Sequence, residues 1–282
     1  MFRRSALFFL CCSILLFPAV VSAQNTDFSG AGDGTTWSDA ANWVGGVVPA
    51  GNADIGDGFT VTLNSNQSHN EVDVVGDQSS GTATLNQTAG TVTGGGWIKL
   101  GRNTGNNGTF NQSGTSVYTG HTVFHIGQNG VGEANFSDSA EFTHTQRLEL
   151  GASSAGTGTV NISGNATLTS SDGNTAPGGR TTIGNGGIGV LNVTDSGVWN
   201  NVSNRVTLGN QGDGTINISG NGTVNVDNLN TGNGGGTGTI NVTGGALNSN
   251  QWLALGQGTN NGGTGILNHS AGTITQLSLI HI

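Results

Sequence analysis

The segments Gly158-Thr-Val-Asn-Ile-Ser-Gly164 and Gly214-Thr-Ile-Asn-Ile-Ser-Gly220 are two copies of one short unit, an asparagine between apolar residues. Eight such units follow one another along the chain, separated by 24 to 31 residues and mostly by about 25. A fixed period of this size is typical of a stacked repeat architecture. The asparagines of the eight units are Asn86, Asn111, Asn135, Asn161, Asn192, Asn217, Asn241 and Asn268.

The apolar residues of each unit form three groups, and within a group they lie two residues apart. Period two predicts a strand with one buried face. We therefore expect an all-β, single-stranded parallel β-helix (β-solenoid) of about eight coils, each of roughly 25 residues with three short strands. The first group flanks the asparagine; the second is Val92, Val117, Phe142, Leu168, Val198, Val224, Leu247 and Ile274; the third includes Ile98 with Leu100, Phe124 with Ile126, Leu148 with Leu150, Ile183, Val206 with Leu208, Leu229, and Leu253 with Leu255.

The repeated asparagine has two interpretations. Eight amides in one column can form a ladder, because a side-chain amide both donates and accepts a hydrogen bond. Alternatively, the asparagines only face solvent beside a buried apolar pair. Neither interpretation predicts an activity.

The chain divides into four predicted segments. Residues 1–23 have the features of a secretory signal peptide, with Arg3 and Arg4 before an apolar run and Val21-Ser22-Ala23 at the cleavage site. Residues 24–75 differ from the repeats, and we expect an N-terminal cap with the first coil. Residues 76–276 are the solenoid repeats. Residues 277–282 fit no column, so we expect a non-native or truncated tail and a natural protein that continues further.

Composition excludes several classes of function. Both cysteines lie within the predicted signal peptide, so the mature chain has no thiol chemistry. It keeps five of the seven basic residues and all 16 acidic ones, a net charge near −11. An acidic chain of this kind is a poor partner for nucleic acid or an anionic membrane. Beyond the predicted signal peptide, no segment approaches the length of a membrane span.

The stretch Thr36-Trp37-Ser-Asp-Ala-Ala-Asn42-Trp43, followed by Gly46-Val-Val-Pro49 and Asp54, is similar to the start of many exported bacterial repeat proteins. With its repeats, the chain resembles autotransporter passenger domains and proteins with a PEP-CTERM sorting tail. The resemblance implies a secreted or surface-displayed β-solenoid and provides no catalytic residue. Neither a barrel nor a sorting tail is present in the sequence, so the export route stays open.

One group of side chains is a candidate site. His121, His125, His144 and Glu149 fall within two neighbouring units, and together they could bind a metal or act as acid and base. The alternative is that they are isolated residues facing solvent on strands and corners. We expect no cofactor and no metal. The arginines Arg102, Arg147, Arg180 and Arg205 are too spread along the sequence to predict binding of an anionic sugar.

Three tryptophans are candidate carbohydrate contacts. Trp97 and Trp252 occupy the same predicted outward position, and Trp199 is expected to face outward on the second strand. Exposed aromatic rings stack on sugars, although they also pack against corners. A calcium-binding roll is rejected, because the glycine-rich corners lack the repeated aspartates. A flat threonine face that orders ice is disfavoured, because Tyr118 and Trp199 would interrupt it.

We therefore expect a secreted or cell-surface scaffold or adhesin-like protein without enzymatic activity. Its partner would be a cell-surface or extracellular polysaccharide, and its oligomeric state is open. The alternative functions are a carbohydrate-active β-helix enzyme, either a polysaccharide lyase or a hydrolase, and a carbohydrate-binding passenger domain. Hydrolysis of a glycosidic bond usually requires two carboxylates that face one groove, and the acidic residues here are scattered.

Overall fold

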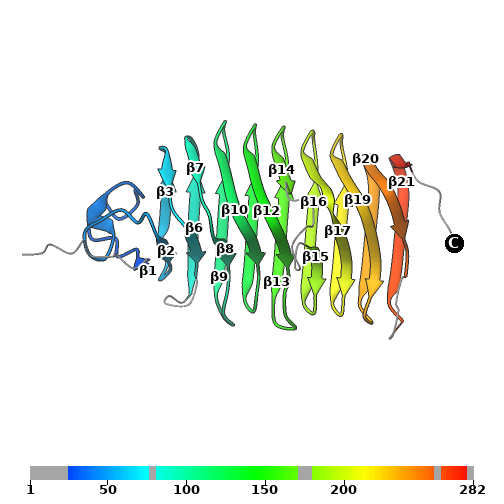
Figure 1. The fold of residues 1–282 in the computed structure, drawn as a ribbon, viewed down its shortest axis with the longest axis horizontal. Helices are drawn as coiled ribbons and strands as arrows, with labels where there is room; N and C mark the ends of the chain where they lie inside the picture. The colour runs from blue at the N-terminus through cyan, green and yellow to red at the C-terminus, as the bar shows by residue number, and fades with distance from the viewer. Residues whose placement is uncertain (1–24, 76–80, 171–179, 257–261, 278–282) are drawn as a thin grey trace, which may run out of the picture.

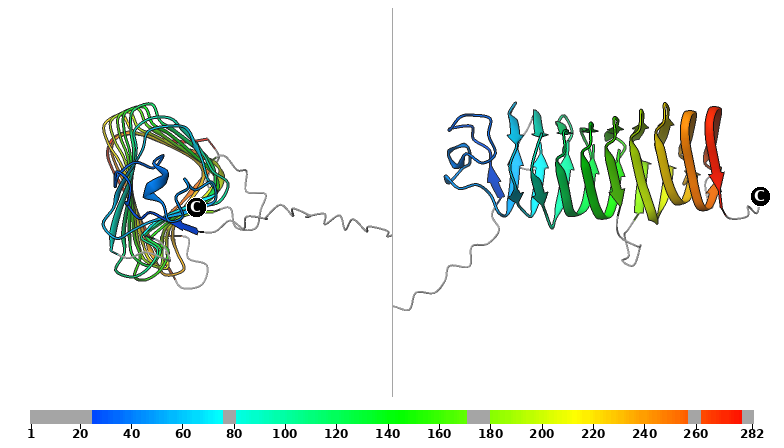
Figure 2. Two further views of the ribbon diagram at one scale, coloured as in Figure 1. Left: turned by 90° about the vertical axis from the view of Figure 1, so that its left-hand side faces the viewer. Right: turned by 90° about the horizontal axis from the view of Figure 1, so that it is seen from above.

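The computed structural model describes residues 25–75, 81–170, 180–256 and 262–277. In these ranges the chain winds into a parallel β-solenoid whose coils stack along one axis (Figure 1). Viewed along that axis, successive coils superpose around a shared interior (Figure 2). The fold class expected from the repeat is confirmed. The predicted signal peptide and most of the predicted tail lie outside the described residues.

Three stacks of parallel strands form the wall. The first stack carries the repeated asparagine and contains nine strands: β3 (Thr60–Leu63), β6 (Thr82–Gln87), β9 (Asn107–Gln112), β11 (Val131–Phe136), β13 (Thr157–Ile162), β16 (Ile188–Val193), β18 (Asp213–Ile218), and the first parts of β20 (Thr237–Ala254) and β21 (Thr264–Gln276). At roughly 4.8 Å per step, this stack is about 40 Å long.

The second and third stacks complete each coil. The second contains β4 (Gln67–Ser68), β7 (Thr91–Thr93), β14 (Thr167–Ser170), the first parts of β10 (Val117–Ile126), β12 (Glu141–Leu150), β17 (Val198–Asn210) and β19 (Thr223–Asn233), and later parts of β20 and β21. The third contains β1 (Asn25–Asp27), β2 (Asn52–Ile55), β5 (Glu71–Val74), β8 (Trp97–Leu100), β15 (Arg180–Asn185) and the later parts of β10, β12, β17, β19 and β20. In β10, β12, β17 and β19 the second and third segments are continuous, joined where the register shifts.

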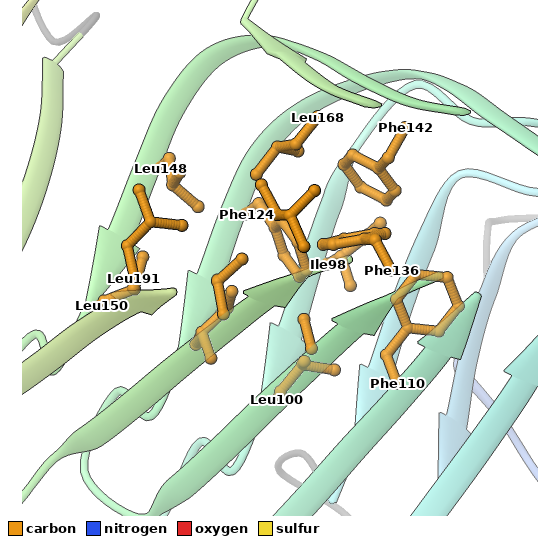
Figure 3. Packing of buried hydrophobic residues seen from close by; sticks show 14 of the residues in the cluster. Ile98, Leu100, Phe110, Phe124, Phe136, Phe142, Leu148, Leu150, Leu168 and Leu191 are labelled. Atoms are coloured by element: carbon orange, nitrogen blue, oxygen red, sulfur yellow. The ribbon is translucent and has the colours of Figure 1, made fainter. Parts of the chain in front are cut away.

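Stacking of neighbouring coils buries the apolar columns, as the period predicts, except at the last coils. There Leu253 and Ile274 are only partly buried, and the prediction for Leu255 is wrong: it is 47% exposed, because no described strand follows β20 in the third stack. Phe142 stacks on Phe124 with 4.9 Å between ring centroids, and Phe136 and Phe110 pack beside them (Figure 3). Leu229, from the least regular unit, is also fully buried. Burial of each such side chain is worth roughly 2 kcal/mol.

The prediction is wrong for two residues of the second column, Val117 and Val198. Tyr118, not Val117, pairs with Val92 and Phe142, and Trp199, not Val198, pairs with Leu168 and Val224. In both coils the larger neighbouring ring occupies the interior, because it buries more apolar surface there.

The asparagine column is a continuous hydrogen-bonded ladder. Each amide nitrogen donates to the amide oxygen of the preceding coil, and the seven N–O distances lie between 2.7 and 2.9 Å. Two shorter ladders join Asn200, Asn225 and Asn248 on the second stack, and Asn185, Asn210 and Asn233 at the end of the third. The ladders satisfy part-buried amides that would otherwise compete with strand pairing.

A column of glycines ends the third stack. In seven consecutive coils a glycine with φ between 62° and 77° follows the last inward residue: Gly101, Gly127, Gly151, Gly184, Gly209, Gly232 and Gly256. A side chain in this left-handed conformation is strained, so the corner favours glycine.

The N-terminal segment lies across one end of the interior (Figure 2). Trp37 and Trp43 are buried there with 4.7 Å between ring centroids, and the Trp43 indole N–H donates to the Trp37 carbonyl. Asn42 is also buried, and its amide oxygen accepts hydrogen bonds from the backbone N–H groups of Gly32 and Gly34. The tryptophans and the asparagine of the N-terminal motif therefore hold this closing segment together.

Candidate functional site

Two of the candidate histidines point into the solenoid. His121 of β10 pairs with His144 of β12, and both side chains are fully buried. The His121 Nδ1 atom lies 3.3 Å from the Gly96 carbonyl oxygen, and the His144 Nε2 atom lies 2.7 Å from the Ser170 hydroxyl. Ser170 is itself buried, so neither this pair nor His121 can reach a solvent-borne substrate.

A third buried histidine belongs to the same interior column. The His69 Nε2 atom lies 2.6 Å from the Tyr118 hydroxyl, and the His69 ring centroid is 5.5 Å from that of His121. The sequence interpretation missed His69, because it lies in the first, irregular coil. Burial lowers the pKa of His69 to about 3, with a further contribution from His121. Burial also lowers the pKa of His121 and of His144 to about 4 each, so all three rings are neutral at pH 7.

The other two candidates lie on the outward side of the third stack. His125 and Glu149 pair across β10 and β12, with 3.1 Å between the His125 Nε2 and a carboxylate oxygen. Arg147 lies 3.5 Å from the same carboxylate, and the Asn185 amide donates to it. Burial raises the pKa of Glu149, but the hydrogen bond and charge of His125, with Arg147 and Asn185, outweigh burial and lower the pKa overall.

An ion-pair cluster precedes this pair on the same face. Lys99 contacts Glu71 and lies 3.3 Å from Asp73. Arg102 lies 3.5 Å from Asp73 on its other carboxylate oxygen. The outward column therefore runs from Asp73 to Lys99, His125 and Glu149 in consecutive coils, with opposite charges near one another.

Two of the three candidate tryptophans are exposed, and the third is buried. Trp97 and Trp252 are 43% and 53% exposed on the outward side of the third stack, as predicted. The Trp97 ring centroid lies 5.1 Å from the Lys99 ammonium and 5.5 Å from the His125 ring. The prediction that Trp199 faces outward is wrong, because its side chain is fully buried in the second column and cannot contact a polysaccharide.

The corrected register also changes the second outward face. Tyr118 points inward and does not interrupt that face. The outward positions of the second stack, which pair from coil to coil, carry valine, glutamate, alanine and asparagine as well as threonine. The threonine array on this face is therefore irregular.

The predicted four-residue site is therefore divided between the interior and the outer face. His121 and His144 point into the interior, whereas His125 and Glu149 point to the outer side, although neighbouring groups also bury these two side chains. Within the described ranges, no group of three or more histidine, cysteine, aspartate or glutamate residues is placed to hold a metal ion. Among those residues there is also no helix with the length and apolar character for crossing a membrane.

No protein-family model matches the chain, and neither a curated protein nor a solved structure shows significant similarity to it. The fold itself defines a class, the parallel β-solenoid repeat proteins. The more specific relation to autotransporter passengers or PEP-CTERM proteins depends on the sequence resemblance alone.

Proposed function

We propose that this chain is an exported, non-enzymatic scaffold of the cell surface or extracellular space, with adhesin-like binding to polysaccharide. The observation that carries the proposal is the unbroken asparagine ladder, which links eight successive coils through seven hydrogen bonds. A wall with in-register strands and side-chain ladders resists bending, because any curvature stretches whole rows of bonds at once. Its mechanism is geometric: a stiff rod displays repeated polar faces at a fixed spacing.

The placement of the ionisable residues supports a role without catalysis. An acid–base site requires its groups within hydrogen-bond reach of one bound substrate. Here His121 and His144 are enclosed, whereas Glu149 is engaged by His125, Arg147 and Asn185. Export is supported by the predicted signal peptide and by the absence of cysteine from the mature sequence.

Two measurements test the proposal. Purified protein is applied to a glycan array and to intact bacterial cells, where the proposal expects binding. It is also incubated with acidic and neutral polysaccharides, where the proposal expects no new reducing ends and no unsaturated products. Turnover that disappears in Glu149→Gln or His125→Gln would overturn the scaffold function in favour of a carbohydrate-active enzyme. Blank results on both the array and the cells would overturn the adhesin-like part.

A further inference from the structure

The basic residues of the mature chain gather on one face. Lys99, Arg102, Arg147, Arg180 and Arg205 are spread over more than 100 residues of sequence, yet all five lie on the outward side or end corner of the third stack. The mature chain has no other lysine or arginine. The net charge is near −11 once the predicted signal peptide is removed, and Lys99 on this face is buried and paired with Glu71 and Asp73. The arginines of the face are therefore where an anion meets positive charge at close range, within a Debye length of about 10 Å at 0.1 M salt.

Three of these arginines form a row. Arg180 pairs directly with Arg205, and the register of β12 with β15 places Arg147 opposite Arg180 in the preceding coil. Like charges at directly paired strand positions, roughly 4.8 Å apart, are mutually unfavourable. Burial lowers the pKa of Arg205, and the charge of the neighbouring Arg180 lowers it further.

The row is only partly neutralised by the protein. Arg147 lies beside Glu149, whereas no carboxylate of the described residues forms an ion pair with Arg180 or Arg205. The Arg205 Nε atom is buried without a hydrogen-bond partner, and Arg180 is exposed. Among the described residues, neither Arg180 nor Arg205 therefore has an ion-pair partner, and two oxygens of a carboxylate or a sulfate can accept hydrogen bonds from one guanidinium group.

Exposed aromatic rings mark both ends of the same column. From Trp97 the column passes through Val123, Arg147, Arg180, Arg205 and Asn228 to Trp252. These six steps of roughly 4.8 Å span about 29 Å along the axis. A small ligand covers a fraction of that length, whereas a linear polymer lying along the axis reaches the arginines and both rings.

We propose that the column from Trp97 to Trp252 binds an anionic polysaccharide, whose carboxylate or sulfate groups pair with Arg180 and Arg205 while its sugar rings stack on Trp97 and Trp252. The inference rests on the proposed adhesin-like function and specifies its ligand. Nucleic acid shares the requirement for positive charge and aromatic rings. Its dense charge is disfavoured by the acidic remainder of the protein, so single-stranded DNA is an outcome to be tested.

The experiment measures binding of the full chain to polygalacturonate by isothermal titration in 50 mM salt, with uncharged dextran and single-stranded DNA as comparison ligands. We expect polygalacturonate binding that weakens as salt rises, and no binding of dextran. The double variant Arg180→Gln/Arg205→Gln should weaken binding about tenfold or more, since each lost guanidinium removes charge-assisted hydrogen bonds. Trp97→Ala/Trp252→Ala should also weaken it at unchanged net charge.

The matched control is Thr84→Glu/Thr215→Glu, which changes net charge by the same amount on the first stack and should retain binding within about twofold. Circular dichroism establishes that each variant is folded. An equal loss in the control, no effect of the arginine variant, or equally tight binding of DNA would overturn the inference. Binding to cells or neutral glycans without polygalacturonate binding would overturn it and leave the adhesin-like function standing. If the protein binds neither polygalacturonate, nor cells, nor neutral glycans, both the inference and the adhesin-like function are overturned.

Discussion

Mild acid should destabilise this solenoid well before its carboxylates are protonated. His69, His121 and His144 are buried in the interior, and burial lowers their pKa from 6.5 to about 3, 4 and 4. In the unfolded chain they return to ordinary values and bind protons below pH 6.5. The unfolded state therefore binds more protons between pH 6.5 and about 4, and stability falls as pH decreases through that window.

The loss of unfolding free energy can be worked out from the lowered histidine pKa values. At pH 5 each unfolded histidine is protonated 1.5 pH units below its ordinary pKa while the folded one stays neutral, which costs about 2 kcal/mol per residue. Three residues together give roughly 6 kcal/mol, comparable with the total stability of many domains. Glu149, whose pKa is lowered, loses its stabilising contribution only below the ordinary value of 4.5.

The assay is guanidinium chloride unfolding at pH 7.5 and pH 5, followed by tryptophan fluorescence and by circular dichroism. His144→Gln keeps a partner for the Ser170 hydroxyl but cannot be protonated, so the difference in unfolding free energy between the two pH values should shrink by about 2 kcal/mol. His269→Gln, at an exposed position, should leave that difference unchanged. Equal stability of the parent protein at both pH values, or an unaltered difference in His144→Gln, would refute the reasoning.

Three further substitutions probe the wall. Asn217→Ala removes two rungs of the first ladder and should lower the unfolding free energy by about 2 kcal/mol, whereas Asn268→Ala at the exposed last rung should cost less; denaturant midpoints compare them. Gly127→Ala, with φ of 67° and the Thr157 carbonyl against the new methyl group, should lower Tm more than Gly105→Ala, where the space is open; equal shifts would contradict the crowding. Trp199→Ala should cost roughly 3–5 kcal/mol by chemical denaturation, and a change below 1 kcal/mol would contradict its burial.

The fold could be predicted from the sequence because one signal recurs eight times. Period two within each segment identifies strands, and the spacing of about 25 residues identifies the coil. The phase of an individual strand is harder to predict. At Val117-Tyr118 and Val198-Trp199 two apolar residues are adjacent, so alternation alone permits either one inside, and the larger ring takes the interior.

The four residues of the predicted site do not lie together in the structure, and the reason is again the phase of a strand. Strict alternation after Tyr118 would place His121 and His125 on the same outward side. The strand register shifts between Tyr118 and His121 and again before Val123, so His121 turns inward while His125 stays outside. Such irregularities reverse the side on which every later residue points, and local composition does not reveal them. The arginine row was missed because its members are distant in sequence and become neighbours only through stacking.

The first ladder carries no information about which coil should follow which. Every amide in it accepts and donates in the same way, so a coil threaded one position too far along would find an equivalent partner. Correct threading must depend on the parts that occur once, such as the cluster of Phe110, Tyr118 and Phe142 and the paired tryptophans Trp37 and Trp43. The same degeneracy makes the rod a structure that can lengthen or shorten by whole coils through gene duplication or deletion, with its ends and its cross-section unchanged.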